Sequence, residues 1–172
     1  MPPLPLIYSI RPARLEDAER VTALLQASYP VLLQRDYASD LLRRALPRIC
    51  VAKPELLRSG SYYVAETPQG QIVGAGGWSW LSPVSAALPA NMGHIRHVVT
   101  DPDHIRQGIG SALMTRALQH AADEGVRKLE CMSTLTAVPF YEAVGLMAMT
   151  EIDLTLAPGI RFPAVHMTMT LA

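Results

Sequence analysis

Two glycines and the residues around them form the segment of this sequence best suited to chemistry. Gly108 and Gly110 lie in the turn Arg106-Gln-Gly-Ile-Gly-Ser111, which leads directly into a segment with helical periodicity. Glycine allows backbone torsions that other residues avoid and lets a bulky anion approach the main-chain amides. The first N–H groups of a helix have no intrahelical partners, and the helix dipole favours negative charge there. The turn therefore predicts a site for a phosphate or diphosphate group.

The surroundings of the turn exclude two common nucleotide-binding patterns. The β-branched run His94-Ile-Arg-His-Val-Val-Thr100 precedes it and predicts a strand, so the order is strand, turn, helix. A dinucleotide-binding fingerprint requires a third glycine, but Leu113 stands at that position. No Gly-Lys-Ser or Gly-Lys-Thr follows the turn, which excludes a Walker P-loop.

The composition predicts an ordinary globular protein with no strong electrostatic partner. The chain has 172 residues, of which 49% are hydrophobic and 17% are charged, as in a domain with a sizeable core. We expect residues 1–5 to form a flexible tail and residues 6–172 to form a single domain. Basic and acidic residues number 15 each, so the net charge of zero gives no support for binding to nucleic acid or to a membrane surface.

Cysteine usage and the N-terminal sequence predict a cytoplasmic protein that holds no metal. Cys50 and Cys131 form no Cys-x-x-Cys pair and have no histidine-rich surroundings, so they indicate neither a disulfide scaffold nor a zinc site. A reducing compartment is the simpler expectation. The opening Met-Pro-Pro-Leu-Pro has neither the basic region nor the apolar run of a signal peptide.

The periodicity of apolar residues predicts a mixed α/β arrangement in which helices and strands do not alternate regularly. Stripes and turn signals indicate helices at 15–28, 32–46, 108–124 and 136–144, and strands at 7–11, 61–66, 71–80, 94–100, 127–131, 147–156 and 165–171. Proline and glycine set several of these limits, since Pro47 should end the second helix. A loop at 81–92 carries two prolines, and loops of this length are often functional.

Two motifs and the spacing between them resemble the core of the GCN5-related N-acetyltransferase superfamily. One is the glycine turn at 106–111, and the other is Thr136-Ala-Val-Pro-Phe-Tyr-Glu-Ala-Val-Gly-Leu146. The resemblance implies a mixed α/β fold whose central sheet of about seven strands is largely antiparallel, with a splayed central strand pair and about four flanking helices. It also implies acetyl-CoA as cosubstrate, no metal, and transfer of the acetyl group to an amine.

Carried over to this sequence, the family's cofactor-binding positions fall on two segments and one further residue. The diphosphate loop corresponds to Arg106, Gln107, Gly108, Ile109, Gly110 and Ser111. The pantetheine arm would lie in the gap beside Val98, Val99 and Thr100, where a backbone N–H can bind the thioester carbonyl and the oxyanion formed during attack. Thr134 replaces the family's cofactor-positioning asparagine, and Ile105 stands where the family usually has Gln or Arg.

The resemblance also implies the residues that move protons. Tyr141 corresponds to the tyrosine that protonates the departing thiolate as a general acid. His94 lies on the central strand where several members carry a Glu or His base, and its ordinary pKa of about 6.5 suits a base at neutral pH. Glu130 is the alternative base, and water acting alone is the third.

The sequence does not specify the acceptor. Because no carboxylate cluster marks a polyamine site, a small-molecule primary amine and a protein amine both remain open. Tyr29, Tyr37 and the 81–92 loop lie where the family builds its variable acceptor site. A non-catalytic module that binds or senses acyl-CoA is the alternative function. A homodimer is a further expectation, because the family's final strands often pair across subunits.

Overall fold

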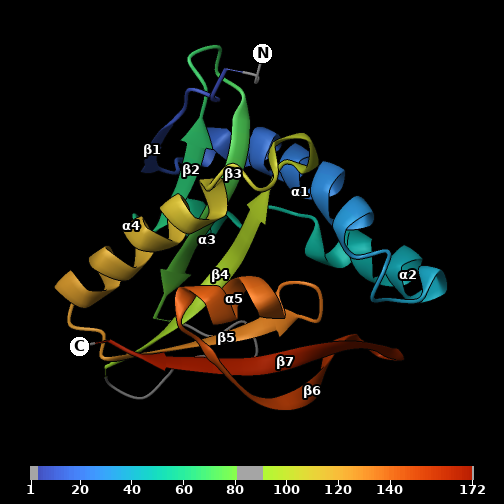
Figure 1. The fold of residues 1–172 in the computed structure, drawn as a ribbon. Coiled ribbons are helices and arrows are strands. Elements are labelled where there is room, and N and C mark those ends of the chain that lie inside the picture. The colour runs from blue at the N-terminus through green and yellow to red at the C-terminus, as the bar shows by residue number, and fades with distance from the viewer. Residues whose placement is uncertain (1–3, 81–90, 172) are drawn as a thin grey trace.

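The computed structural model describes residues 4–80 and 91–171, so the expected tail at 1–5 and the loop at 81–92 fall partly outside the described residues. The described strands form one seven-stranded sheet in the order β1-β2-β3-β4-β5-β7-β6 (Figure 1). Its strands are β1 (Ser9–Pro12), β2 (Tyr62–Glu66), β3 (Ile72–Ser79), β4 (Met92–Thr100), β5 (Lys128–Thr134), β6 (Met147–Ala157) and β7 (Ile160–Thr170). The helices are α1 (Ala18–Leu32), α2 (Ser39–Ile49), α3 (Pro54–Leu57), α4 (Ile109–Asp123) and α5 (Val138–Val144).

The sheet is mixed and largely antiparallel, which confirms the expected fold class. Only β4 and β5 run parallel among these strands, and every other neighbouring pair is antiparallel. The parallel pairing extends from Met92 to His94 on β4 and then stops, although both strands continue. Beyond that point the two strands diverge, as the resemblance implied.

Helices cover both faces of the first half of the sheet because its strands alternate apolar side chains between the faces. On β2, Tyr62 and Val64 pack into a cluster with α1, whereas Tyr63 and Ala65 pack into a cluster with α4. Helix α1 and helix α4 therefore lie on opposite faces of β2 and β3 (Figure 1). This burial fixes α4 against the sheet and so positions the glycine turn that precedes it.

The first two long helices differ from their predicted bounds. Helix α1 continues past residue 28 to Leu32 through Pro30, and α2 begins at Ser39 and continues through Pro47. A proline in the last turn of a helix removes one backbone hydrogen bond, and here each helix is followed by a buried residue, Leu33 after α1 and Cys50 after α2. In both helices the turn containing the proline is closed by a backbone bond, from Leu33 to Tyr29 at 3.0 Å and from Cys50 to Leu46 at 2.9 Å.

The last strand is also longer than predicted. Strand β7 begins at Ile160 and not at 165, so it passes through Pro163. The missing N–H of Pro163 costs no bond to β5, because pairing with β5 begins one residue later, at Ala164 opposite Thr134. Strand β7 thereby lies between β5 and β6 and carries His166 next to β5.

Candidate active site

The glycine turn has the conformation that an anion-binding loop requires. Gly108 has a φ of 79° and immediately precedes α4, and Arg106 has a φ of 62°. No side chain of the described residues caps this end of α4, so the N–H groups of its first turn keep their hydrogen-bonding capacity. Together with the helix dipole, these donors make the turn suitable for a diphosphate.

The second glycine has a different role, which the sequence did not reveal. A Cβ on Gly110 would lie 2.9 Å from Cε1 of Phe140 and 3.5 Å from Oγ1 of Thr100. A Cβ on Gly108 would meet nothing within 4 Å. Gly108 is therefore needed for its torsion, whereas Gly110 allows α4 to approach α5 closely. Phe140 in turn contacts Tyr141 edge to face, with ring centroids 5.2 Å apart.

A bulge in β4 opens the sheet beside this turn. The pairing of β3 with β4 shifts register between Ala75 and Gly77, and His97 adopts a φ of 36° in the bulge. The hydroxyl of Tyr62 donates to the carbonyl of His97 at 2.8 Å and holds the bulge in place. Val98 and Val99 follow, in the part of β4 that has separated from β5.

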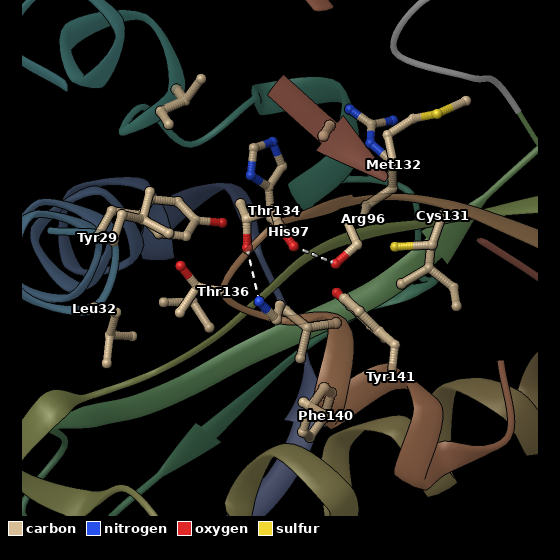
Figure 2. A pocket seen from close by; sticks show the side chains of 18 of the residues that line it. Tyr29, Leu32, Arg96, His97, Cys131, Met132, Thr134, Thr136, Phe140 and Tyr141 are labelled. Atoms are coloured by element: carbon tan, nitrogen blue, oxygen red, sulfur yellow. Dashed lines mark hydrogen bonds between the residues drawn. The ribbon is translucent and has the colours of Figure 1, made fainter. Parts of the chain in front are cut away.

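A cavity of about 670 Å³ occupies this opening and brings together the predicted site residues (Figure 2). Of the residues predicted to act or to bind cosubstrate, the cavity is lined by Tyr141, His94, Val98, Val99, Thr100, Arg106, Gly108, Ile109, Gly110, Ser111 and Thr134. Gln107 is exposed and does not line it. The cavity also reaches Tyr29 but not Tyr37, which the sequence placed with it at the acceptor site.

Tyr37 instead connects segments of the chain that surround the cavity. Its hydroxyl donates to the carbonyl of Pro163 at 2.6 Å and accepts the N–H of Leu135 at 2.8 Å. Its ring stacks on Phe162 with centroids 4.4 Å apart. One side chain thus joins the segment after α1 to β7 and to the end of β5.

Tyr141 lies beside a buried thiol on one side of the cavity (Figure 2). Burial raises the pKa of Tyr141 well above its usual value, and the neighbouring Cys131 contributes to the shift. Burial likewise raises the pKa of the Cys131 thiol to about 12, although a hydrogen bond with Tyr141 opposes this. Cys131 therefore remains a thiol at neutral pH and lacks the thiolate that a covalent mechanism would use.

His94, Glu130 and His166 form a chain of hydrogen bonds across three strands. Nδ1 of His94 lies 3.3 Å from Oε1 of Glu130, and Nε2 of His166 lies 3.0 Å from Oε2 of the same carboxylate. His94 is 2% exposed and lines the cavity, whereas the side chain of His166 is 26% exposed. Burial lowers the pKa of His94 to about 4, with the hydrogen bond to Glu130 opposing the shift. The neutral imidazole donates Nδ1–H to the carboxylate, which leaves Nε2 as an acceptor.

Thr134 has a structural bond that its predicted role did not include. Its hydroxyl oxygen accepts the N–H of Ala137 at 3.2 Å, just before α5 (Figure 2). The hydroxyl hydrogen is still available for donation. Thr134 therefore both shapes the start of the α5 segment and lines the cavity.

The rest of the cavity wall contains side chains that the sequence did not indicate as functional. Its apolar members include Leu32, Leu33, Ile49, Leu154, Leu156 and Phe162, and the lysine and arginine side chains in this part are Arg48, Lys53 and Arg96. They come from α1 and the residue after it, α2, the segment before α3, β4, β6 and β7. No local motif could have identified them, because they meet only in the folded chain.

The described part of the chain lacks two kinds of feature. No group of three or more His, Cys, Asp or Glu side chains there could hold a metal ion. In the same residues, no helix is long and apolar enough to cross a membrane.

The fold and the site together define an acyltransferase-like protein whose central strands part around a cavity. The model of the acetyltransferase (GNAT) family matches residues 18–146, and the chain belongs to this family. A GCN5-related N-acetyltransferase from Rhodopseudomonas palustris is similar in structure, with a TM-score of 0.75, 22% identity, and coverage of 99% of this chain and 100% of that one. The PaiA N-acetyltransferase of Thermoplasma acidophilum, solved in complex with coenzyme A, has a TM-score of 0.71 and 14% identity, with 96% of this chain and 100% of that chain covered.

A curated relative gives a sequence similarity over part of the chain. The glucosamine 6-phosphate N-acetyltransferase of Trypanosoma brucei brucei is 32% identical over 81 residues, which are 47% of this chain. The match spans 54% of that protein, so about half the length of the relative is covered.

Proposed function

We propose that this protein is an acetyl-CoA-dependent N-acetyltransferase that acts on a primary amine of a small molecule. The observation that carries the proposal is a single cavity joining the uncapped start of α4, the gap between β4 and β5, and the hydroxyl of Tyr141. Membership of the acetyltransferase (GNAT) family supports the class of reaction. The name of the relative from Trypanosoma brucei brucei supports a small amine as the kind of acceptor.

The residues present fit acetyl-CoA in two places. The N–H groups at the start of α4, together with Gly108 and Arg106, would hold the diphosphate. The unpaired edge of β4 at Val98 and Val99 would bind the pantetheine arm through its backbone. When bound, the thioester supplies an activated carbonyl carbon next to a good leaving group.

The chain would assist direct attack by the neutral amine. A bond forms between the amine nitrogen and the carbonyl carbon, the bond from that carbon to sulfur breaks, and the electron pair of that bond leaves with sulfur. Tyr141 donates its proton to this sulfur, and a proton leaves the nitrogen for Nε2 of His94. The high pKa of Tyr141 suits this transfer because a thiol in the same surroundings also has a raised pKa, as Cys131 does.

His94 and Glu130 act as a pair in this proposal and are not alternatives. As His94 accepts a proton at Nε2, it can release Nδ1–H to Glu130, and His166 at the other carboxylate oxygen leads to solvent. The excess proton would therefore leave the cavity through side chains while Tyr141 regains one. Direct transfer requires no covalent acyl-enzyme, consistent with the protonated state of Cys131.

The proposal is tested by binding and turnover with the same protein. Isothermal titration with acetyl-CoA should show binding, and a thiol-release assay over a panel of amines should show turnover on at least one. Tyr141→Phe should retain acetyl-CoA binding and lower kcat by about 10²-fold or more, while Tyr8→Phe, on the described segment before β1, serves as the control. Binding without turnover on any amine would favour the acyl-CoA-sensing alternative, and absence of binding would overturn both.

A further inference from the structure

The charged side chains that line the cavity all have the same sign. Among the described residues they are Arg48, Lys53, Arg96 and Arg106, and the lining contains no aspartate or glutamate. Arg106 belongs to the diphosphate turn, whereas the other three lie on α2, before α3 and on β4. A cavity that receives an amine would be expected to carry carboxylates if the rest of the acceptor were also cationic or if the ammonium form were to be bound.

Arg96 is buried and forms no ion pair with any described residue. It is 7% exposed, and its Nη1 donates to Oγ of Ser79 at 3.1 Å. None of the ion pairs among the described residues includes Arg96 or Lys53. Burying a charge is costly unless it is paired, so a guanidinium in this state is suited to an anion brought by a ligand.

Lys53 and His97 lie in the electrostatic field of Arg96. Burial lowers the pKa of Lys53, and repulsion by Arg96 lowers it further, while Glu55 opposes the shift. Burial lowers the pKa of His97 to about 3, with Arg96 and then Lys53 adding to the shift. Glu55 attracts both Arg96 and Lys53 and opposes the lowering of the pKa of each. It is exposed and forms no ion pair with either cation in the described part of the chain, so solvent screens its charge.

The position of Arg96 relates this positive charge to the reacting atoms. Arg96 follows His94 by two residues on β4 and precedes the bulge and Val98. Figure 2 shows Arg96 and His97 on one side of the cavity and Tyr141 and Phe140 on the other. A ligand anion at Arg96 would therefore place an attached amine close to the gap where the thioester is expected.

We infer that the acceptor amine carries an anionic group, a carboxylate or a phosphate, which Arg96 and Lys53 bind at the end of the cavity opposite Tyr141. The inference rests on the proposed function and names the class of its substrate. Arg96 supplies several donors in a fixed geometry that matches both kinds of anion, and Lys53 adds a point charge. Arg48, exposed at the rim, gives the acceptor's anion an attractive path into the cavity.

Matched acceptors test the inference. For one chain length, kcat/KM is compared for an ω-aminoalkanoate, the corresponding aminoalkanol and the corresponding diamine, and separately for glucosamine and glucosamine 6-phosphate. We expect the anionic member of at least one set to exceed its neutral counterpart by about 10- to 100-fold, and the two sets distinguish a carboxylate from a phosphate. Equal or better use of the neutral amines and diamines would overturn the inference while leaving the proposed function intact.

Variants separate anion binding from a structural role of Arg96. Arg96→Gln and Lys53→Gln should raise KM for the anionic acceptor by about 10-fold or more and leave KM for acetyl-CoA unchanged. Arg96→Lys should restore part of the loss, because a lysine keeps the charge but not the planar donor geometry. Lys128→Gln, an exposed change at the start of β5 and away from the cavity, is the matched control. An equal loss of kcat/KM on neutral and anionic amines would assign Arg96 a structural role only.

A binding measurement decides the inference even if no amine is turned over. With coenzyme A present, inorganic phosphate and an ω-aminoalkanoate are titrated into the wild-type protein and into Arg96→Gln, and the thermal midpoint and heat of binding are recorded. Saturable binding that Arg96→Gln abolishes would support the anion subsite even where the proposed acetyl transfer fails. No difference between the two proteins would overturn it.

Discussion

His94 and Glu130 are the last facing residues of the parallel strands β4 and β5, and their side chains lie 3.3 Å apart from Nδ1 to Oε1. Parallel neighbours place facing side chains on the same side of the sheet. The strands separate immediately after this pair, so His94 is fixed at the edge of the cavity by the last residue pair of the two strands. The carboxylate is held on its other side by His166.

Replacing Glu130 tests this arrangement. Glu130→Gln keeps the shape but removes the negative charge that supports a proton on His94, so kcat/KM should fall by about 10-fold or more while the affinity for acetyl-CoA is unchanged. Steady-state kinetics and titration calorimetry check this result. Glu142→Gln on the exposed side of α5 is the control. Wild-type kcat/KM in Glu130→Gln would exclude the carboxylate from the proton path.

The pH dependence should follow the acceptor and not His94. Because burial places the pKa of His94 at about 4, its imidazole is already neutral between pH 6 and pH 8. The fall of kcat/KM over this range should come from protonation of the acceptor amine and should move with the pKa of that amine. Profiles recorded with two acceptors of different pKa check this point. An inflection near pH 6.5 that both acceptors share would contradict the buried, neutral state of His94.

Replacing either glycine of the turn by alanine should destabilise the protein, but for different reasons. Gly110→Ala introduces a methyl group 2.9 Å from Cε1 of Phe140, so we expect a loss of about 1–3 kcal/mol in the free energy of unfolding and weaker acetyl-CoA binding. Adding Phe140→Leu should relieve the overlap and recover part of the stability. Gly108→Ala meets no atom but must adopt a φ of 79°, so its cost should be about 1–2 kcal/mol.

Two controls accompany the glycine variants. Gly159→Ala has the same φ of 79° in the turn between β6 and β7 and should lose stability without a change in acetyl-CoA affinity. Phe140→Leu alone measures the effect of the smaller side chain. Denaturant unfolding and titration calorimetry give both quantities. If Phe140→Leu rescued Gly108→Ala as well as Gly110→Ala, the separate roles would be wrong.

Among the residues at the start of α1, Asp17 should make the largest contribution to the dependence of the free energy of unfolding on acidic pH. Its side chain is fully buried, and it accepts two bonds from Arg11 at 2.9 Å, one from Arg20 at 2.7 Å and the N–H of Arg14 at 2.7 Å. The hydrogen bonds from Arg11 lower the pKa of Asp17 from 3.8 to about 2, which corresponds to about 2 kcal/mol of stability.

The direction of the pKa shift of Asp17 determines the pH range in which its contribution to stability is lost. Because the pKa in the folded state lies below the ordinary value, the stabilisation is complete above about pH 5 and is lost as the pH falls toward 2. Asp17→Asn should therefore be less stable than the wild type by about 2 kcal/mol or more at pH 7, and the difference should shrink at pH 3. Urea unfolding at both pH values measures it, with the exposed Asp40→Asn as control. A difference independent of pH would refute the linkage.

Local sequence was sufficient to predict the parts of the site that lie close together in the chain. The turn from Arg106 to Ser111, apart from Gln107, and Tyr141 line one cavity in the structure. The local sequence indicated the turn and the motif because their conformations depend on neighbouring residues and on glycine torsions. The bounds of α1 and α2 were predicted less well. There, burial against β7 and the sheet outweighed the prolines that normally end a helix.

The contacts between distant residues came only from the tertiary structure. Tyr37 reaches Leu135 and Pro163 across separations of 98 and 126 residues, and no pattern near Tyr37 indicated these bonds. Arg96 reads in the sequence as one more charged strand residue. Its position among other cations, with no ion pair to a described residue, becomes visible only when α2, the segment before α3 and β4 are brought together.

The sequence by itself determined the turn torsions, the helix that follows and the kinds of side chain that can move a proton. The order of the strands decided which of those side chains meet. Because β7 lies between β5 and β6, Glu130 has His94 on one neighbouring strand and His166 on the other. Glu130 is 36 residues from each of these histidines in the sequence. Such pairings depend on long-range register, which is set by the burial of whole strands and not by any local preference.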